Sequence, residues 1–153
     1  MSKEFTRVVN GVTKSLEGML NRANLIDGYL DRVVYPMYQN LQRERWASEN
    51  ATQGSSWPSL QPAYAEMKLK RYADYPGGGT KMMIATKRLF NSVVGDEDTS
   101  EHEKVVSNHS LQIFSTTPYA EYANVVREFK EFSVETMREI MSGIVNYITR
   151  GVE

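Results

Sequence analysis

The chain has 153 residues, a length that suits one domain and would leave two domains with small cores. Its 18 Lys and Arg against 19 Asp and Glu give a net charge of -1, which disfavours a dedicated nucleic-acid binder because neutralising phosphates requires an excess of cations. The absence of cysteine excludes disulfides, thiolate catalysis and sulfur-ligated zinc sites.

The first predicted elements are helices. Apolar residues recur at three- and four-residue steps over residues 5–23, which predicts one amphipathic helix. A second pattern of the same period runs from Leu25 to about Trp46. Pro36 lies inside it, removes a backbone hydrogen bond and clashes with the preceding turn. We therefore expect a kink or a helix restart near residues 34–35.

A long loop that contains a short helix is predicted next. After Ala47 the composition changes to Ser, Asn, Thr, Gln, Gly and Pro, residues that set turns or hydrogen-bond their own backbone. Residues 63–73 are good helix formers, whereas Pro76 and the glycines at 77–79 break the chain again. A loop of this length is more often functional or disordered than neutral, so we expect it to carry contacts.

An antiparallel sheet is expected to follow the loop. Residues 89–94 form a short, mainly apolar piece that is predicted to lead into a strand. The segments 103–107 and 111–115 are typical of the two strands of a hairpin, with a turn at residues 108–110. The acidic run at residues 96–101 is expected to form an exposed loop before the hairpin.

Two helices are predicted at the end of the chain. Thr117 followed by Pro118 is a helix-start signal, because Pro is favoured at the first helical position. Ser133 can cap the last helix, in which apolar residues repeat at helical spacing up to Gly151.

Together these patterns predict a single α+β domain over residues 1–153. N-terminal helices occupy residues 5–46, and the extended loop region with its short helix occupies residues 47–81. A small antiparallel sheet of three to four strands is expected over residues 82–116. The C-terminal helices, residues 117–151, are expected to pack against that sheet.

No constellation of reacting side chains is evident in the sequence. His102 and His109 flank the predicted hairpin and could come close in space, but a metal site needs three or four ligands with supporting partners. The glycines at 77–79 lack the spacing of a phosphate-binding loop. We therefore expect no enzyme activity, no metal and no cofactor. An enzyme that uses the two histidines is the most distant alternative.

A basic and aromatic cluster lies in and beside the short helix of the loop. Such interleaving can bind single-stranded nucleic acid through stacking and charge. It is more typical of a solvated helix face whose tyrosines pack locally, and Tyr, Trp and Arg are also enriched in the hot spots of protein interfaces. The candidate subunit or partner contacts are Trp57, Tyr64, Lys68, Lys70, Arg71, Tyr72 and Tyr75.

Three short motifs stand in a recognisable order: a Trp-x-x-Leu loop with a Lys soon after, a Thr-x-x-Leu-x-x-Ser element, and a Tyr-Ala helix start. Their positions are Trp57, Leu60, Lys68, Thr86, Leu89, Ser92, Tyr119 and Ala120. In this order the chain resembles the virion-morphogenesis family of Mu-like tailed phages and the related neck and tail-completion proteins of other long-tailed phages. Lys87 stands where that family commonly has Gly, so the tight backbone there is expected to relax.

The resemblance implies a structural virion protein of the head–tail joint, a neck, tail-completion or tail-terminator component, and not an enzyme. Such proteins form rings of six or twelve copies around the DNA channel. The implied partners are further copies of the chain, neighbouring neck and tail proteins, and genome DNA that passes through the lumen without sequence-specific binding. A near-neutral charge fits such a lumen, because a strongly basic wall would hold DNA.

The last expectations from the sequence concern the location of the protein and an alternative function. The N-terminus opens no apolar run, and no window reaches the ~20 apolar residues of a membrane span. We therefore expect synthesis in the host cytoplasm, incorporation into the virion and no membrane partner. The alternative is a small nucleic-acid-associated module that uses the cluster from Lys68 to Tyr72.

Overall fold

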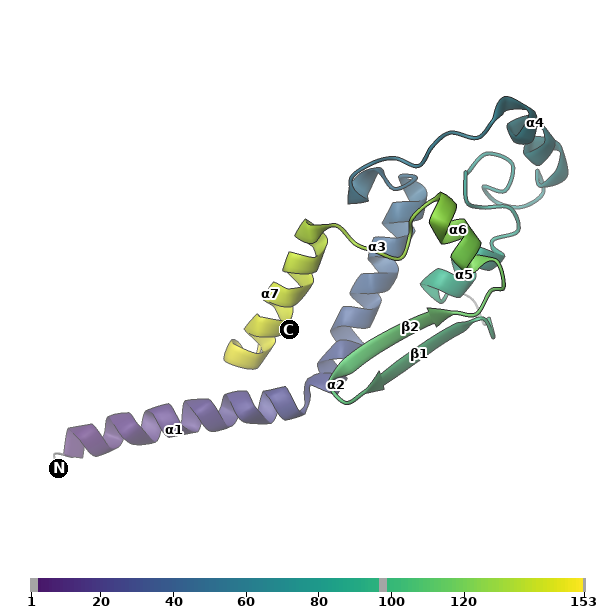
Figure 1. Ribbon diagram of the computed structural model, residues 1–153. Helices are drawn as coiled ribbons and strands as arrows, with labels where there is room; N and C mark the ends of the chain where they lie inside the picture. Colours follow the sequence, from purple (N-terminus) through teal and green to yellow (C-terminus); the bar gives the residue numbers. More distant parts are fainter. Residues whose placement is uncertain (1–2, 97–98, 153) are drawn as a thin grey trace.

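The computed structural model describes residues 3–96 and 99–152, with side chains from residue 11 onward (Figure 1). Helices precede and follow one antiparallel hairpin along the described chain, which confirms the α+β class. The elements are α1 (Lys3–Asn24), α2 (Ile26–Tyr29), η1 (Leu30–Val34), α3 (Tyr35–Ala47), η2 (Ala51–Gln53), α4 (Pro62–Arg71), α5 (Arg88–Val94), β1 (His102–Ser107), β2 (Ser110–Ser115), α6 (Ala120–Val126) and α7 (Val134–Arg150).

The predicted restart of the second helix is confirmed. Pro36 occupies the first turn of α3, where its missing N–H costs nothing. The turn before it, η1, is π-helical, so the chain widens just where the proline ring would clash with a regular helix. Leu25 separates α1 from α2, and α1 therefore leaves the rest of the molecule in its own direction (Figure 1).

Two clusters of buried apolar side chains hold the elements together. The larger lies where the end of α3 meets the long loop, α5 and α6, and contains Trp46, Trp57, Leu89, Val93, Ala120 and Phe129. The smaller lies in α2 and η1, where the second half of α7 and the tip of the hairpin pack against Ile26, Tyr29 and Leu30. Tyr29 stacks on Tyr147 of α7 with ring centroids 4.3 Å apart.

The hairpin forms as predicted. His102 pairs with Ser115 at one end and Ser107 with Ser110 at the other. Asn108 and His109 take left-handed φ values of 50° and 59°, as a two-residue turn that matches strand twist requires.

The larger sheet predicted over residues 82–116 is not confirmed, because the described residues contain two strands. The prediction that residues 89–94 lead into a strand is wrong: they form α5, which packs between α3 and β2. Leu89 and Val93 are four residues apart and share one buried helical face. The acidic loop predicted at 96–101 includes residues 97–98, which lie outside the described residues.

The segment that links α6 to α7 is held by side chains from distant parts of the chain. The buried guanidinium of Arg45 donates to the carbonyls of Phe129 and Glu131, and burial lowers the Arg45 pKa to about 10. Gln42 also donates to the Phe129 carbonyl, at 3.1 Å. The Trp57 indole N–H donates to the carbonyl of Glu128 at 2.9 Å. These bonds fix the position from which α7 starts.

Both C-terminal helices form. The prediction that Ser133 caps α7 is confirmed, because its hydroxyl accepts the backbone N–H of Thr136. Helix α6 begins at Ala120, two residues later than Pro118 predicted, since Thr117 and Ala120 first close a turn through a 2.9 Å backbone bond.

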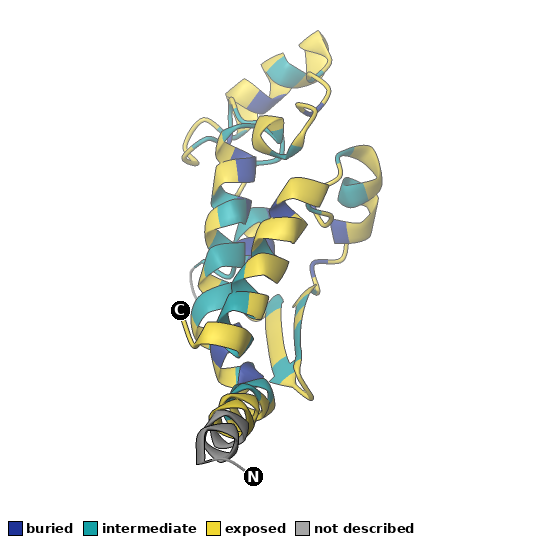
Figure 2. Ribbon diagram, turned by 90° about the vertical axis from the view of Figure 1, so that its left-hand side faces the viewer, coloured by how far each residue is buried: buried dark blue, intermediate teal, exposed yellow. Residues whose placement is uncertain are grey.

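Helix α1 extends away from the other elements (Figure 1), and most of its described side chains are exposed (Figure 2). Among the described residues it contacts α7, where Arg22 donates to the carbonyls of Ile148 and Thr149. Among its described side chains, Val12, Leu16 and Leu20 of the apolar stripe are exposed. None of the helices in the described part of the chain combines the length and hydrophobicity needed to cross a bilayer.

Candidate functional site

The residues that carry the family resemblance come together around one cavity, although they span more than sixty positions of the chain. Leu60, Lys68, Thr86, Leu89 and Tyr119 line the cavity. Trp57 and Ala120 lie in the buried cluster beneath it, which also contains Leu89. Ser92 is buried below and shares a 2.8 Å hydrogen bond with Ser115 of β2. We call this cavity the basic groove.

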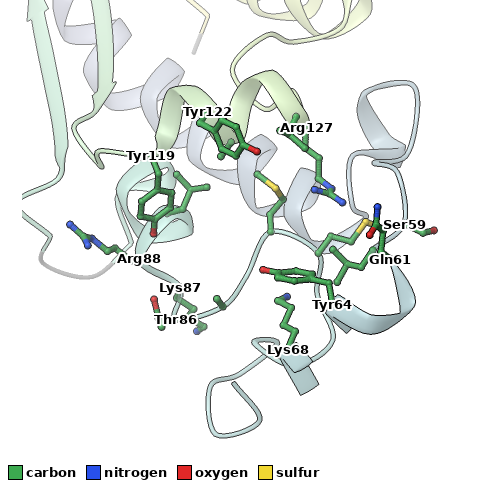
Figure 3. Close-up of a pocket in the computed structure, with 17 residues that line it drawn as sticks. Ser59, Gln61, Tyr64, Lys68, Thr86, Lys87, Arg88, Tyr119, Tyr122 and Arg127 are labelled. Carbon is green, nitrogen blue, oxygen red and sulfur yellow. The ribbon is translucent and has the colours of Figure 1, made fainter. Parts of the chain in front are cut away.

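The basic groove lies between the long loop, the start of α5 and helix α6 (Figure 3). Its volume is about 660 Å³, within the range of sites that hold a small ligand or a few side chains of a partner. Methionine side chains adapt to irregular partners, which suits a surface that binds a polypeptide. The apolar lining residues are Leu60, Met82, Met83, Leu89, Ala123 and Val126.

The loop is folded tightly enough to hold Met82 and Met83 beside the groove. Gly78 is buried, and a Cβ there would lie 2.3 Å from the carbonyl oxygen of Ala85, so a larger residue does not fit. Lys81 donates to the carbonyl of Ala47 at 2.8 Å, and the Met82 N–H donates to Glu49. The loop is thereby fastened to the end of α3.

Lys68 is the most unusual charged residue of the groove, because it is only 1% exposed. Its ammonium donates to the carbonyl of Lys81, which uses one of its three protons. Burial lowers the Lys68 pKa, while the nearby carboxylate of Glu49 opposes that shift. A buried ammonium with spare donors is suited to bind an anionic oxygen.

Three further cations line the groove, and no Asp or Glu is among its lining residues. Within residues 3–96 and 99–152, the ammonium of Lys87 has no hydrogen-bond or ion-pair partner. Arg127 donates to the carbonyl of Pro58 at 2.9 Å, and its buried Nε has no partner in the same part of the chain. Arg88 differs, because Glu101 at the rim neutralises it.

The Arg88–Glu101 ion pair fixes one end of the groove. The Nε of Arg88 lies 2.8 Å from a carboxylate oxygen of Glu101, and that hydrogen bond holds the Glu101 pKa below its ordinary value. Thr117 donates to the same carboxylate at 3.2 Å. The guanidinium also lies 5.9 Å from the ring centroid of Tyr119. The groove therefore has an aromatic wall of Tyr119 and Tyr122 next to Arg88, and Tyr64 lies across the cavity beside Lys68 (Figure 3).

The expected relaxation of the backbone at Lys87 is wrong. Lys87 has φ 63° and ψ -4°, the left-handed conformation that Gly adopts without strain. The chain needs this conformation to turn from the loop into α5, whose first residue follows directly. Lysine is therefore strained here, and its side chain projects a charge that Gly would not supply.

Lys87→Gly is expected to raise the free energy of unfolding by about 0.5–1 kcal/mol, because relief of left-handed strain outweighs the added freedom of the unfolded chain. Lys87→Ala is the control: it removes the same charge but keeps the strained backbone, so no gain is expected. Urea unfolding of the two variants measures the difference. Equal stabilities for Gly and Ala at this position would show that the backbone is not strained.

Lys68→Met is expected to change the free energy of unfolding at neutral pH by less than about 1 kcal/mol, because removing a buried charge offsets the lost hydrogen bond. In the native protein the unfolded state binds more protons between the lowered folded pKa of Lys68 and its ordinary value of 10.5. Stability contributed by this group therefore rises with pH through that window. Urea titrations at several pH values in that window should show no such rise in the free energy of unfolding of the variant. A rise with pH as steep as that of the native protein would contradict the lowered pKa of Lys68.

The remaining candidate contacts from the sequence are divided between interior and surface. Trp57 is buried within the subunit, in the larger apolar cluster. Lys70 points outward and pairs with Glu66 in an exposed ion pair. Arg71 lies over the ring of Tyr72 at 5.6 Å, and Tyr75 is exposed beyond it. The run from Lys68 to Tyr72 is thus not one surface.

The two histidines are not brought together. His102 lies at the start of β1 and His109 in the turn at the other end of the hairpin. The ring of His102 is partly buried between the hydroxyl of Tyr35 and the carbonyl of Ser92, each 2.9 Å away. In the part of the chain that the structure describes, no three His, Asp or Glu side chains are placed to hold a metal.

Sequence reasoning missed Arg127, Tyr122 and the two groove methionines. Arg127 and Tyr122 belong to α6 and its end, far along the chain from the loop that they face. One signal was present: Tyr122 follows Tyr119 by three residues, which places both rings on one helical face.

Comparison with known proteins adds no relative. Searches against protein-family models, curated proteins and solved structures each found no match.

Proposed function

We propose that this protein is a structural component of the head–tail joint of a tailed phage, a neck, tail-completion or tail-terminator protein that assembles as a ring around the DNA channel. The proposed ring has six or twelve copies, contacts neighbouring neck and tail proteins, and passes DNA without reading its sequence. No catalytic activity belongs to this proposal. Its class comes from the resemblance at the motif residues, and the geometry supports assembly.

The uncovered apolar stripe of α1 supports assembly most directly. Val12, Leu16 and Leu20 succeed one another at four-residue steps and are 54%, 59% and 62% exposed. A helix of 22 residues with one apolar face is normally stabilised by burying that face. Within the described structure nothing covers these three side chains, so a second copy of the chain is the occupant that we propose.

The convergence of the motif residues supports the family assignment. Seven of the eight motif positions, which come from separate segments, lie in the lining of the basic groove or in the buried cluster beneath it. Chance matches scattered along a chain would have no reason to meet in space. A shared structural role explains both the order of the motifs and their meeting point.

The hairpin offers a second place for subunit contacts in this proposal. Each strand of the hairpin pairs on one side, so each has an outer edge without a partner strand in the described structure. Such edges readily accept another strand, which a neighbouring subunit would supply.

Light scattering on purified protein over a range of concentrations tests the proposal. Each subunit has a mass of 17.5 kDa, and we expect a species of six or twelve subunits. A mass of one subunit at every concentration would contradict the proposed function.

A further inference from the structure

Helix α1 and the basic groove lie at opposite ends of the molecule. In Figure 1, α1 projects from one end, whereas the long loop, α5 and α6 that form the groove lie at the other. The 22 residues of α1 span about 33 Å, so the helix can reach a neighbouring subunit. Two unlike surfaces at opposite ends are what a head-to-tail contact between copies requires, and repetition of such a contact closes a ring when the rotation allows it.

The apolar stripe of α1 has one charged side chain beside it. Glu17 follows Leu16 directly and precedes Leu20 by three residues, so the three side chains share an arc of about 100° on the helix surface. Glu17 is exposed and has no hydrogen-bond or ion-pair partner within the described residues. Lys14 lies about half a turn away from Leu16, and Arg22 is bound to the end of α7. The face of α1 that carries the exposed leucines is therefore apolar with a single negative charge.

The basic groove is complementary to such a face. Its lining contains no Asp or Glu, and its leucine, methionine and valine side chains offer an apolar surface. Arg127 has a buried Nε without a partner in the described part of the chain. Burial lowers the pKa of Lys68 most, and the charge of Arg127 adds to that shift, so these two cations lie close together. A carboxylate that enters the groove would relieve their repulsion.

We propose that α1 of one subunit lies in the basic groove of the next, with Leu16 and Leu20 against the apolar lining and Glu17 toward Arg127. Only the position of Glu17 faces a cation, whereas both leucines contact the side chains of Met82 and Met83. This contact rests on the ring assembly proposed above and assigns both of its surfaces.

The exposed face of α7 does not match the groove in the same way. Val134, Met137 and Met141 form an exposed apolar stripe on α7. The charge beside that stripe is Arg138, which follows Met137 directly and precedes Met141 by three residues. A cation at this place would face the cations of the groove, so the charge selects α1 over α7.

The chemistry of the groove also favours a polypeptide over nucleic acid. A phosphate backbone would satisfy the cations but would leave the apolar lining of leucine and methionine without a partner. An apolar helix face with one carboxylate satisfies both. The cavity of about 660 Å³ is large enough for a few side chains of such a helix.

Disulfide cross-linking tests the contact directly, because the chain has no cysteine of its own. Leu16 and Val126 are both exposed in the subunit, and Val126 lines the groove. A chain that carries Leu16→Cys with Val126→Cys should give a ladder of linked subunits on a non-reducing gel after mild oxidation. Such a bond forms only where the two Cα atoms come within about 7 Å. Leu20→Cys with Val126→Cys probes the next turn of α1 in the same way.

The matched control for cross-linking is Lys14→Cys with Val126→Cys, which moves the thiol to the back of α1. Its yield of linked subunits should be at least about tenfold lower, because the thiol then points away from the groove. Leu16→Cys alone should remain unlinked. A covalent pair formed by that single variant would show that α1 contacts α1 of another copy, and would overturn the groove contact.

Reversal of one charge provides a second test. Glu17→Lys should raise the concentration needed for assembly at least about tenfold, because its ammonium would face Arg127. Lys14→Glu, on the back of α1, should leave that concentration unchanged. Light scattering measures the mass, and circular dichroism verifies that each variant is folded.

The outcomes separate this contact from the proposed function. A wild-type protein that stays at one subunit contradicts both. Wild-type rings without a ladder from Leu16→Cys or Leu20→Cys contradict only the groove contact. A ladder together with a mass of two subunits supports the contact and contradicts the ring. Salt-sensitive retention on immobilised DNA that Lys87→Glu weakens, with no ladder, would overturn the contact and assign the groove to nucleic acid.

Discussion

Trp46→Ala is expected to lower the free energy of unfolding by about 3–5 kcal/mol, the largest effect of any single substitution that we predict. Trp46 is the second-last residue of α3, and its side chain, 2% exposed, lies inside the larger buried cluster. Its ring contacts those of Trp57, Phe90 and Phe129, with centroids 5.4, 5.9 and 5.3 Å away. Removing it opens a cavity between the long loop, α5 and the segment that precedes α7.

Urea unfolding followed by circular dichroism measures this loss. The same measurement on Trp46→Phe gives the cost of a smaller change at this position. The indole N–H of Trp46 is buried and has no partner within the described residues, so Phe should cost less than Ala, about 1.5 kcal/mol or below. Tyr122→Ala is the exposed aromatic control, expected within about 0.5 kcal/mol of the native protein. A loss for Trp46→Ala as small as that of the control would contradict the described core.

Leu16→Glu with Leu20→Glu is expected to abolish assembly while the subunit stays folded. Both side chains are exposed in the subunit, so their replacement should change its stability by no more than about 0.5 kcal/mol. Glu is a helix former comparable to Leu, and α1 itself should therefore persist. In an assembly, however, two carboxylates would be buried against a neighbour without partners, which is strongly unfavourable.

The matched control places the same charges on the other face of α1. Lys14 and Asn21 are exposed and lie about half a helical turn away from Leu16 and Leu20, so Lys14→Glu with Asn21→Glu should leave the mass unchanged. Light scattering at one concentration compares the three proteins. If both double variants kept the wild-type mass, the apolar stripe of α1 would not be a subunit contact.

Local signals predicted those parts of the fold that are determined locally. Pro36 predicted the helix restart, Ser133 the cap of α7, and the Asn108–His109 pair the turn of the hairpin, because each acts through its own backbone. Helix α5 was not predictable in this way. Its residues 89–94 are a short, mainly apolar segment, compatible with a strand or a helix by periodicity alone, and packing between α3 and β2 decides in favour of the helix.

The candidate site was predictable in part. The motif positions indicated the loop and the start of α5, but not that Lys68 is buried or that Arg127 faces it from the end of α6. Such facts depend on which distant segments meet, and a single sequence does not specify that. The conformation of Lys87 shows the same limit, because the surrounding structure imposes the left-handed backbone on a residue that does not favour it.

Electron microscopy of the purified, negatively stained protein is the direct test of ring assembly. We expect closed rings of six or twelve subunits with a central channel, formed by the wild-type protein and absent from Leu16→Glu with Leu20→Glu. Fields of single 17.5 kDa particles, or open fibres without closure, in wild-type samples at high concentration would contradict it.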